Sequence, residues 1–509
     1  MNNKHEICSP NPEATIESIR SLGYDLNIAT SDLIDNSISA NAKNIWVLHK
    51  WVAENSSFII YDDGQGMDED ELFKAMALGS TSPTIERDPK DLGRFGLGLK
   101  VASWSQCRVL TVATKKENGE LNIRKWDLDF VSKKNEWLLM KETDDESLKI
   151  INKLIENHNS GSVVLLQNLD RLLSIDVDDL VESEQFFYEK ISLLKKYLSM
   201  VFHRYLTGPN AINIHVSNLE ECFQKGKKLK PWDPFMEKNT NTIPIGEEKL
   251  KFKDSSISVS PFVLPHHSKF KSDEAFREAG GINGWNVHQG FYVYRQRRMI
   301  MHGGWMGFRK AEDHYKLARI RLDIPNSMDT DWKIGVKKIA VTPPDFFKKE
   351  LKRIVKITTE KAGKVYRYRG AITKRGNPRV SDIVWKIIKN RAGEVSYKIE
   401  RKHPVVKSIL ASSKNKKELN ALITMIEKTI PVETIIVNDR ENPNSHIHSK
   451  HSSEEDLVPL KKWYDEHMDF LTKSNRMSRE EAFEKLITME PFNLYLNELE
   501  VFRGSENNE

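Results

Sequence analysis

An aspartate and an asparagine stand four residues apart in a stretch whose apolar residues recur at helical spacing. Asp32 and Asn36 therefore project from the same face of a helix that the spacing predicts over residues 12–42. A carboxylate and an amide placed in this way can polarise a water molecule and hold a hard cation through oxygen. Taken alone, the pair is more typical of a solvated helix face.

A second group of residues follows directly after a strand predicted at residues 57–61. It consists of Asp62, the turn glycines Gly64 and Gly66, and Met67. A carboxylate at a strand end can accept a hydrogen bond from an exocyclic amine, and glycines let the backbone approach a flat ring. Taken alone, this group is also compatible with a plain Asp-Gly turn.

The third group is the glycine-rich segment GRFGLGLK at residues 93–100, which opens a predicted helix. Its backbone N–H groups and the start of the helix could bind phosphate oxygens. The segment does not fit a dinucleotide fingerprint, because it follows a long polar loop at residues 79–92 rather than a strand. The sequence also contains no G-x-x-x-x-G-K-[ST] phosphate-binding loop.

The elements that must position these groups alternate between strands and helices. Strands are predicted at residues 44–51, 57–61, 108–115 and 162–166, and a helix near 185–206. In the second half, GFYVYRQRRMI, KLARIRLDIP and WKIGVKKIAV are predicted strands, and PPDFFKKELKRIVKITTEK is a predicted helix with proline at its start. A composition shift near residues 207–260 marks a boundary, and we expect domains at residues 1–210, 211–365 and 366–509.

Composition bounds the class of protein. The chain has 509 residues, 78 lysines and arginines against 73 aspartates and glutamates, and only three cysteines, far apart in sequence. These cysteines exclude a disulfide scaffold and a zinc ribbon and fit a reducing cytosol. The sequence has no signal peptide, and no apolar run reaches the roughly 18 residues of a membrane span. We expect a multidomain cytoplasmic protein without membrane association.

The order of the three groups resembles the Bergerat nucleotide-binding fold. SDLIDNSISANAKNI, then DDGQGMD, then LGSTS and LGRFGLGLK follow the pattern of the GHKL superfamily of gyrase, Hsp90, MutL and histidine kinases. The closest likeness is to the MORC-like branch with its prokaryotic relatives, and it covers residues 15–170 strongly and extends more weakly to 365. The implied fold is α+β: an N-terminal α/β sandwich with a mixed sheet covered by helices, an S5-like β/α transducer domain, and a smaller mixed C-terminal region.

The resemblance also implies roles for single residues at an ATP and Mg²⁺ site. Asp32 stands where the family has a glutamate base, Asn36 matches the Mg²⁺ ligand, and Lys337 or Lys338 is the lysine that reaches the γ-phosphate. The residues implied in ATP binding are Asn36, Asp62, Gly64, Gly66, Met67, Gly93, Phe95, Gly96, Leu97, Gly98, Lys100 and Ser162.

Two positions depart from the family pattern, and one of them, Ser162, keeps the hydroxyl of the threonine that is common there. Asp32 is one methylene shorter than glutamate, which could displace the base by roughly 1 Å and slow hydrolysis on the order of 100-fold. Asp35 is the alternative base. We therefore expect a slow ATPase.

The implied activity is a Mg²⁺-dependent conformational machine, an ATP-gated clamp that closes as a homodimer. Residues 348–379 contain twelve basic and two acidic side chains, which predicts contact with the phosphates of double-stranded DNA. The family's prokaryotic branch implies anti-phage defence or DNA maintenance, with partner proteins from the same operon. The alternatives are an Hsp90-like chaperone, against which the basic segment speaks, and a nucleotide-binding module with negligible hydrolysis. The candidate DNA contacts are Lys348, Lys349, Lys352, Arg353, Lys356, Arg367, Arg369, Lys374 and Arg375.

Overall fold

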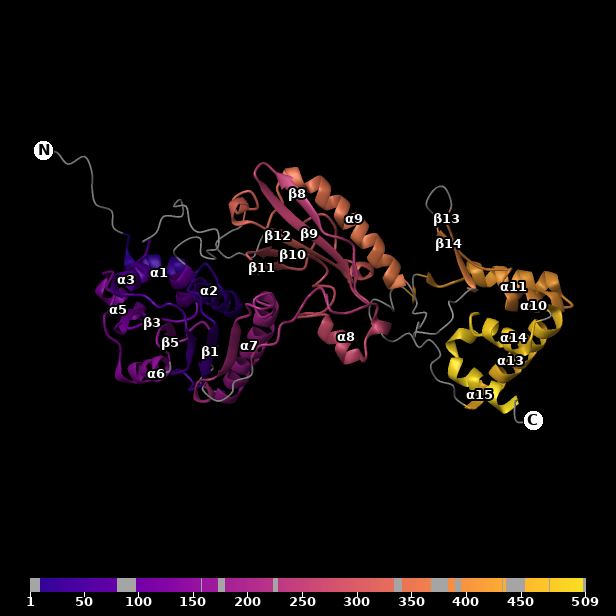
Figure 1. Ribbon diagram of the computed structural model, residues 1–509, viewed down its shortest axis with the longest axis horizontal. Coiled ribbons are helices and arrows are strands. Elements are labelled where there is room, and N and C mark those ends of the chain that lie inside the picture. The colour runs from indigo at the N-terminus through magenta and orange to yellow at the C-terminus, as the bar shows by residue number, and fades with distance from the viewer. Residues whose placement is uncertain are drawn as a thin grey trace. The chain divides into compact units, whose positions relative to one another are not determined.

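The computed structural model divides into two compact units, Met1–Arg367 and Tyr368–Glu509, which are described separately (Figure 1). Both units combine helices and strands, so the α+β class is confirmed. The structure describes residues 10–79, 98–156, 158–172, 179–222, 228–333, 341–367, 383–389, 395–432, 434–435, 454–475 and 477–506.

The first unit begins with a mixed six-stranded sheet in the order β4-β3-β5-β2-β1-β6. Neighbouring strands are antiparallel except for β1 and β6, which are parallel. All six residues of the central strand β2 are buried, as its continuous apolar run requires. The strands are β1 Asn44–Lys50, β2 Ser57–Asp62, β3 Val109–Lys115, β4 Asn122–Asp127, β5 Gly161–Gln167 and β6 Asn213–Asn218.

Helices cover both faces of this sheet. One buried cluster joins α1, α2, α4 and α7 to the sheet, through residues such as Leu33, Trp104 and Phe187. The cluster on the other face joins α6 to strand residues such as Ile59. The helices are α1 Pro12–Arg20, α2 Leu26–Ser39, α3 Glu69–Met76, α4 Gly98–Trp104, α5 Leu128–Lys134, α6 Asp145–Ile155 and α7 Leu180–Val201.

Two sequence-based expectations about this region are wrong. The single helix predicted over residues 12–42 is two helices, because Gly23 adopts a φ of +66° and Asp25 caps the second helix by accepting a hydrogen bond from Ile28 N at 2.9 Å. The boundary expected at residue 210 precedes β6, which pairs with β1. Its alternate residues Ile214 and Val216 are buried in the same core as α2, so the first sheet extends to Asn218.

A second sheet follows in the order β11-β10-β12-β9-β7, with β8 paired to β9. Helix α9 packs on it, and Leu351 and Ile354 lie in the shared core. The segment GFYVYRQRRMI, predicted as one strand, is a hairpin that turns at Gln296 and Arg297. The elements are β7 Ile243–Pro244, β8 Glu248–Phe252, β9 Ser255–Val263, α8 Asp273–Ala279, β10 Gly290–Arg295, β11 Arg298–His302, β12 Ala318–Ile324 and α9 Asp345–Arg367.

The second unit is a smaller mixed region. A two-stranded antiparallel ribbon precedes helices whose core includes Tyr464, Phe483 and Leu499. Among the described helices of the chain, none combines the length and apolar character that a bilayer span requires. The elements are β13 Trp385–Lys389, β14 Val395–Ile399, α10 Pro404–Ser412, α11 Lys416–Lys428, α13 Glu454–Asn475, α14 Arg479–Leu486 and α15 Leu496–Glu506. Among the residues that the structure describes, the short 3₁₀ helices are Leu219–Glu221, His267–Lys269, Asp313–Tyr315, Asn326–Met328 and Phe492–Leu494.

Candidate active site

The carboxylate of Asp62 lies at the end of the central strand and is only 5% exposed. Ser37 Oγ on α2 donates a hydrogen bond to Oδ2 at 2.8 Å, and Gly64 N donates to Oδ1 at 2.9 Å. Burial raises the pKa of Asp62 to about 6, against the lowering effect of these two donors. The group is therefore mostly ionised at neutral pH, and its oxygens can accept further hydrogen bonds.

Asp62 belongs to a polar row that crosses three strands. The strand register places Asp62 opposite Ser162 on β5, and Ser162 opposite Thr114 on β3. The hydroxyls of Ser162 and Thr114 lie 2.8 Å apart, and Met67 N donates to Thr114 Oγ1 at 2.9 Å. The sheet thus brings Asp62, Met67 and Ser162 together, as the sequence predicts. Thr114 was missed, because it lies in an apolar strand with no local motif.

The two turn glycines allow close backbone approach. A Cβ at Gly64 would lie 2.8 Å from Asp62 Oδ1 and 2.9 Å from Ala40 O. Gly66 has a φ of +67°, and a Cβ there would lie 2.0 Å from Lys115 O. A side chain at either position would therefore displace the loop that follows β2, and at Gly66 the backbone conformation also disfavours one.

Helix α2 carries the candidate base and cation ligand one turn apart. Asp32 is buried, and it accepts a hydrogen bond from Tyr24, whose pKa is raised by burial and by the charge of Asp32. Asn36 is exposed, so its amide oxygen can reach a ligand in solution. Asp35, the alternative base, is buried.

An arginine from the second sheet contacts both buried aspartates. Arg298 Nε lies 3.2 Å from Asp35 Oδ2, and Arg298 Nη2 lies 3.8 Å from Asp32 Oδ1. Burial opposes the charge of Arg298, but the aspartates outweigh it and raise its pKa. Sequence reasoning missed Arg298, because 263 residues separate it from Asp35 and no local pattern links them.

The predicted phosphate-binding segment is described only in part. Gly98 begins α4, and Lys100 on that helix is buried, with burial lowering its pKa to about 8. Lys100 Nζ donates to Ala75 O at 2.8 Å, in the last turn of α3, so its contact with phosphate stays a prediction. Outside the described residues lie Gly93, Phe95, Gly96, Leu97, Lys337 and Lys338.

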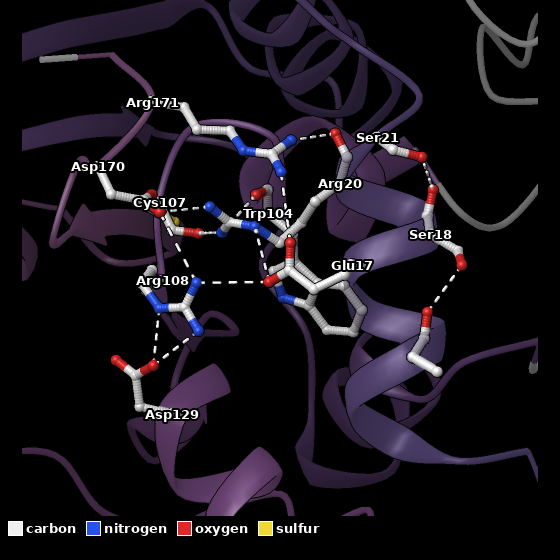
Figure 2. Close-up of polar contacts among 11 residues, drawn as sticks. Glu17, Ser18, Arg20, Ser21, Trp104, Cys107, Arg108, Asp129, Asp170 and Arg171 are labelled. Atoms are coloured by element: carbon white, nitrogen blue, oxygen red, sulfur yellow. Dashed lines mark hydrogen bonds and ion pairs between the residues drawn. The ribbon is translucent and has the colours of Figure 1, made fainter. Parts of the chain in front are cut away.

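The far end of α4 is held by a buried arginine (Figure 2). Arg20 Nη1 donates to Trp104 O at 2.9 Å and to Cys107 O at 2.7 Å, and Nη2 contacts Asp170 Oδ2 at 2.5 Å. A cation at the C-terminal carbonyls of a helix satisfies acceptors that lack backbone partners. Figure 2 also shows Arg108 bridging Asp129 and the same network. Together, Lys100 and Arg20 fix α4 near both of its ends.

The donor set fits a hard cation held mainly by the phosphates of a nucleotide. Across the described ranges, no group of three or more histidine, cysteine, aspartate or glutamate side chains is placed to hold a metal ion. Mg²⁺ commonly uses few protein ligands and completes its shell with water and substrate phosphates. The exposed amide oxygen of Asn36 meets this requirement.

Basic side chains form an exposed face on α9. Lys348 pairs with Asp345 at 2.6 Å, and Arg353 pairs with Glu350 and Glu248. Arg367 ends the helix, whereas Arg369, Lys374 and Arg375 lie outside the described residues. The candidate contacts with described side chains are exposed, namely Lys348, Lys349, Lys352, Arg353 and Lys356.

A comparison with known protein families covers the region of the candidate site. Residues 24–161 match the family described as "Histidine kinase-, DNA gyrase B-, and HSP90-like ATPase". A segment is also similar to the mouse protein "MORC family CW-type zinc finger protein 3", with 31% identity over 94 residues. This match covers 18% of the chain and 10% of the mouse protein, so the chain spans about a tenth of that relative's length. The family match contains Asp32, Asn36 and Asp62, and ends one residue before Ser162.

Proposed function

We propose that the chain binds ATP with Mg²⁺ and hydrolyses it slowly, because residues 24–161 match the GHKL-type ATPase family and a segment of the chain is similar to a MORC family protein. The observation that carries the proposal is the carboxylate of Asp62, buried at the end of β2 and oriented by Ser37 and Gly64. An ionised carboxylate held in this way can accept a hydrogen bond from the adenine amino group. Burial strengthens that bond, since the surroundings do not screen it.

The reaction requires a base and neutralisation of phosphate charge. Asn36 would hold Mg²⁺, which supplies that neutralisation when bound. Asp32, one turn earlier on α2, would take a proton from the attacking water. The shorter side chain of Asp32 supports slow turnover, since a base displaced by about 1 Å can cost on the order of 100-fold in rate.

We further propose that ATP closes a homodimeric clamp on double-stranded DNA. The exposed lysines of α9 support the DNA contact, because a basic face of this kind binds phosphates irrespective of sequence. We propose a role in anti-phage defence or DNA maintenance, with partner proteins from the same operon. This proposal requires that the clamp acts on duplex DNA. A cytoplasmic location remains a prediction from composition.

A second candidate function is a nucleotide-binding module without turnover. The observation that favours it is the engagement of Asp32, which accepts a hydrogen bond from Tyr24 and lies 3.8 Å from Arg298 Nη2. A carboxylate stabilised by a hydroxyl donor and a nearby cation is a weaker base. Binding of ATP without phosphate release would select this candidate.

Titration calorimetry with Mg²⁺ and a non-hydrolysable ATP analogue tests nucleotide binding. Asp62→Ala should weaken affinity by at least about 100-fold, since it removes a buried charged acceptor. Asp70→Asn is the matched control, because Asp70 is exposed in the first turn of α3 and should leave affinity unchanged. Equal affinities for Asp62→Ala and the wild type would remove the assigned adenine contact.

Phosphate release separates the remaining possibilities. Release that rises with duplex DNA supports the clamp, and release that rises with unfolded protein supports a chaperone. Mass measurement with the ATP analogue should give a dimer. A monomer under saturating nucleotide would contradict the clamp while leaving the ATPase intact.

A further inference from the structure

We infer that Arg298 is a positioning residue for ATP hydrolysis, which holds Asp35 and Asp32 of α2 from the tip of the β10–β11 hairpin. The inference deepens the proposed function and rests on it. It places control of the base in the second sheet, outside the segment that matches the ATPase family.

The hairpin turn sets where Arg298 lies. Gln296 and Arg297 have φ values of +48° and +68°, so both central residues of the turn are in the left-handed region. A two-residue turn with both residues in this region has a twist that matches the twist of the two antiparallel strands. Here neither residue is glycine. The turn pairs Arg295 with Arg298 across the two strands, and Arg298 is the first residue of β11.

The tip is docked on the end of α7. Tyr205 donates its hydroxyl hydrogen bond to Gln296 O at 2.5 Å, and Arg297 donates to Arg204 O. The Arg298 guanidinium lies 5.7 Å from the ring centre of Phe202, which caps α7. These contacts hold the tip at the end of α7, independently of the aspartates on α2.

The β10 side of the hairpin tip is fixed within its own domain. Arg295 Nε lies 3.0 Å from both oxygens of Asp329, and both side chains are buried. Arg295 and Arg298 thus occupy paired positions on the two strands. Arg295 binds Asp329 of its own domain, whereas Arg298 binds Asp35 on α2, which packs on the first sheet. A shift of the hairpin therefore moves the partner of Asp35.

Arg298 acts on the base through Asp35 and through its charge. Its Nε donates to Asp35 Oδ1 at 3.2 Å and its Nη1 donates to Met299 O at 2.8 Å, whereas Asp32 lies beyond hydrogen-bond distance at 3.8 Å. The side chain is 4% exposed, so little water screens the three charges. Without the guanidinium, two buried carboxylates on one helix would repel each other and turn away.

The test compares Arg298→Met with Arg298→Lys and with Arg277→Met. Arg277 is an exposed arginine on α8 that makes no contact with the described residues of the hairpin tip, so its replacement controls for the loss of a positive charge and should leave kcat unchanged. Arg298→Met should lower kcat at least about tenfold while the Kd for the ATP analogue stays within about threefold. Arg298→Lys should restore part of kcat, since it returns the charge without the planar fork.

One further variant keeps the test decisive. Adding Asp35→Asn to Arg298→Met removes both partners of the buried pair, which preserves folding where the single variant does not fold. The double variant should show no further loss of kcat beyond Arg298→Met. A wild-type kcat in a folded Arg298→Met variant, or a loss confined to nucleotide affinity, overturns the inference. Absence of nucleotide binding by the wild type overturns the proposed function instead.

Discussion

Ser37 on α2 donates its hydroxyl hydrogen bond to Oδ2 of Asp62 on β2 at 2.8 Å. Ser37 follows Asn36 directly, and Asp32 lies on the same helix. The bond therefore joins the helix that carries the candidate base and cation ligand to the strand end that carries the candidate adenine acceptor. A ligand that forms a hydrogen bond with Asp62 therefore also affects the orientation of α2.

Nucleotide affinity should fall as the solution becomes more acidic. Burial raises the pKa of Asp62 to about 6, and the ionised carboxylate accepts a hydrogen bond from the adenine amine more strongly than the protonated acid does. At pH 5 roughly a tenth of the groups are ionised, so the Kd should be about tenfold weaker than at neutral pH. Calorimetry between pH 5 and 7.5 measures this trend, and Asp62→Asn should lose it. An equal slope in both proteins would assign the titration to another group.

The same shift makes ionised Asp62 unfavourable for folding. Its pKa is raised from 3.8 to about 6, so its contribution to stability is full below 3.8 and is lost as the pH rises through 6. Asp62→Asn should therefore stabilise the nucleotide-free protein at pH 7.5, by about 1–3 kcal/mol. At pH 5 the gain should shrink by roughly half. Thermal unfolding at the two pH values gives both numbers, and a gain independent of pH would contradict the assignment.

Replacing the candidate base should separate binding from turnover. Asp32→Asn keeps the shape and the acceptor oxygen but cannot take a proton, so kcat should fall at least about 100-fold. The Kd for the analogue should stay within about threefold, and ATP itself should then trap the dimer. Phosphate release and mass measurement in ATP check both outcomes. Normal turnover in this variant would mean that Asp35 or another group is the base.

Two glycines with the same backbone angle offer a matched pair. Gly66 and Gly79 both have a φ of +67°, but a Cβ would lie 2.0 Å from Lys115 O at Gly66 and would meet nothing within 4 Å at Gly79. Gly79→Ala should cost about 1–2 kcal/mol of stability through the backbone angle alone. Gly66→Ala should cost at least about 2 kcal/mol more, because the loop after β2 must move. Similar melting temperatures for the two variants would contradict the close approach.

The α9 surface can be tested through salt dependence. Lys349, Lys352 and Lys356 are exposed and form no ion pair with any described residue. Changing all three to glutamate should lower the slope of log affinity against log salt for duplex DNA by about 2–3. Glutamates at the exposed Lys133, Lys134 and Lys149 make the same charge change on another surface and should leave the slope unchanged. An unaltered slope in the α9 variant would leave that helix as a solvated surface.

Local patterns predicted the parts of the site that depend on neighbours in sequence. Alternation and β-branched residues located β1, β2 and β5 to within one residue at each end, and the Asp-Gly turn after β2 follows from glycine content. The strand register places Ser162 opposite Asp62. The residue types at the ends of these two strands were enough to suggest this pairing. These features depend on the periodicity of the backbone, which can be recognised in a single sequence.

Contacts between distant segments could not be predicted. Arg298 is one of several arginines in an apolar stretch, and only the folded chain selects it for Asp35, 263 residues away. The parallel pairing of β6 with β1 was missed for the same reason, because a short alternating strand carries no mark of its partner. The division of the long predicted helix into two could have been predicted, since Gly23 signals the end of one helix and Asp25 signals the start of the next.

The late position of β6 in the chain bears on how the protein can be divided. A fragment that stops at residue 210 lacks this strand, and the backbone N–H and C=O groups of β1 that face it would lose their partners. Such an open edge recruits strands from other molecules, so the fragment should aggregate during expression. Cutting after Asn218 keeps the edge covered, and the ribosome must likewise release these residues before the sheet can close.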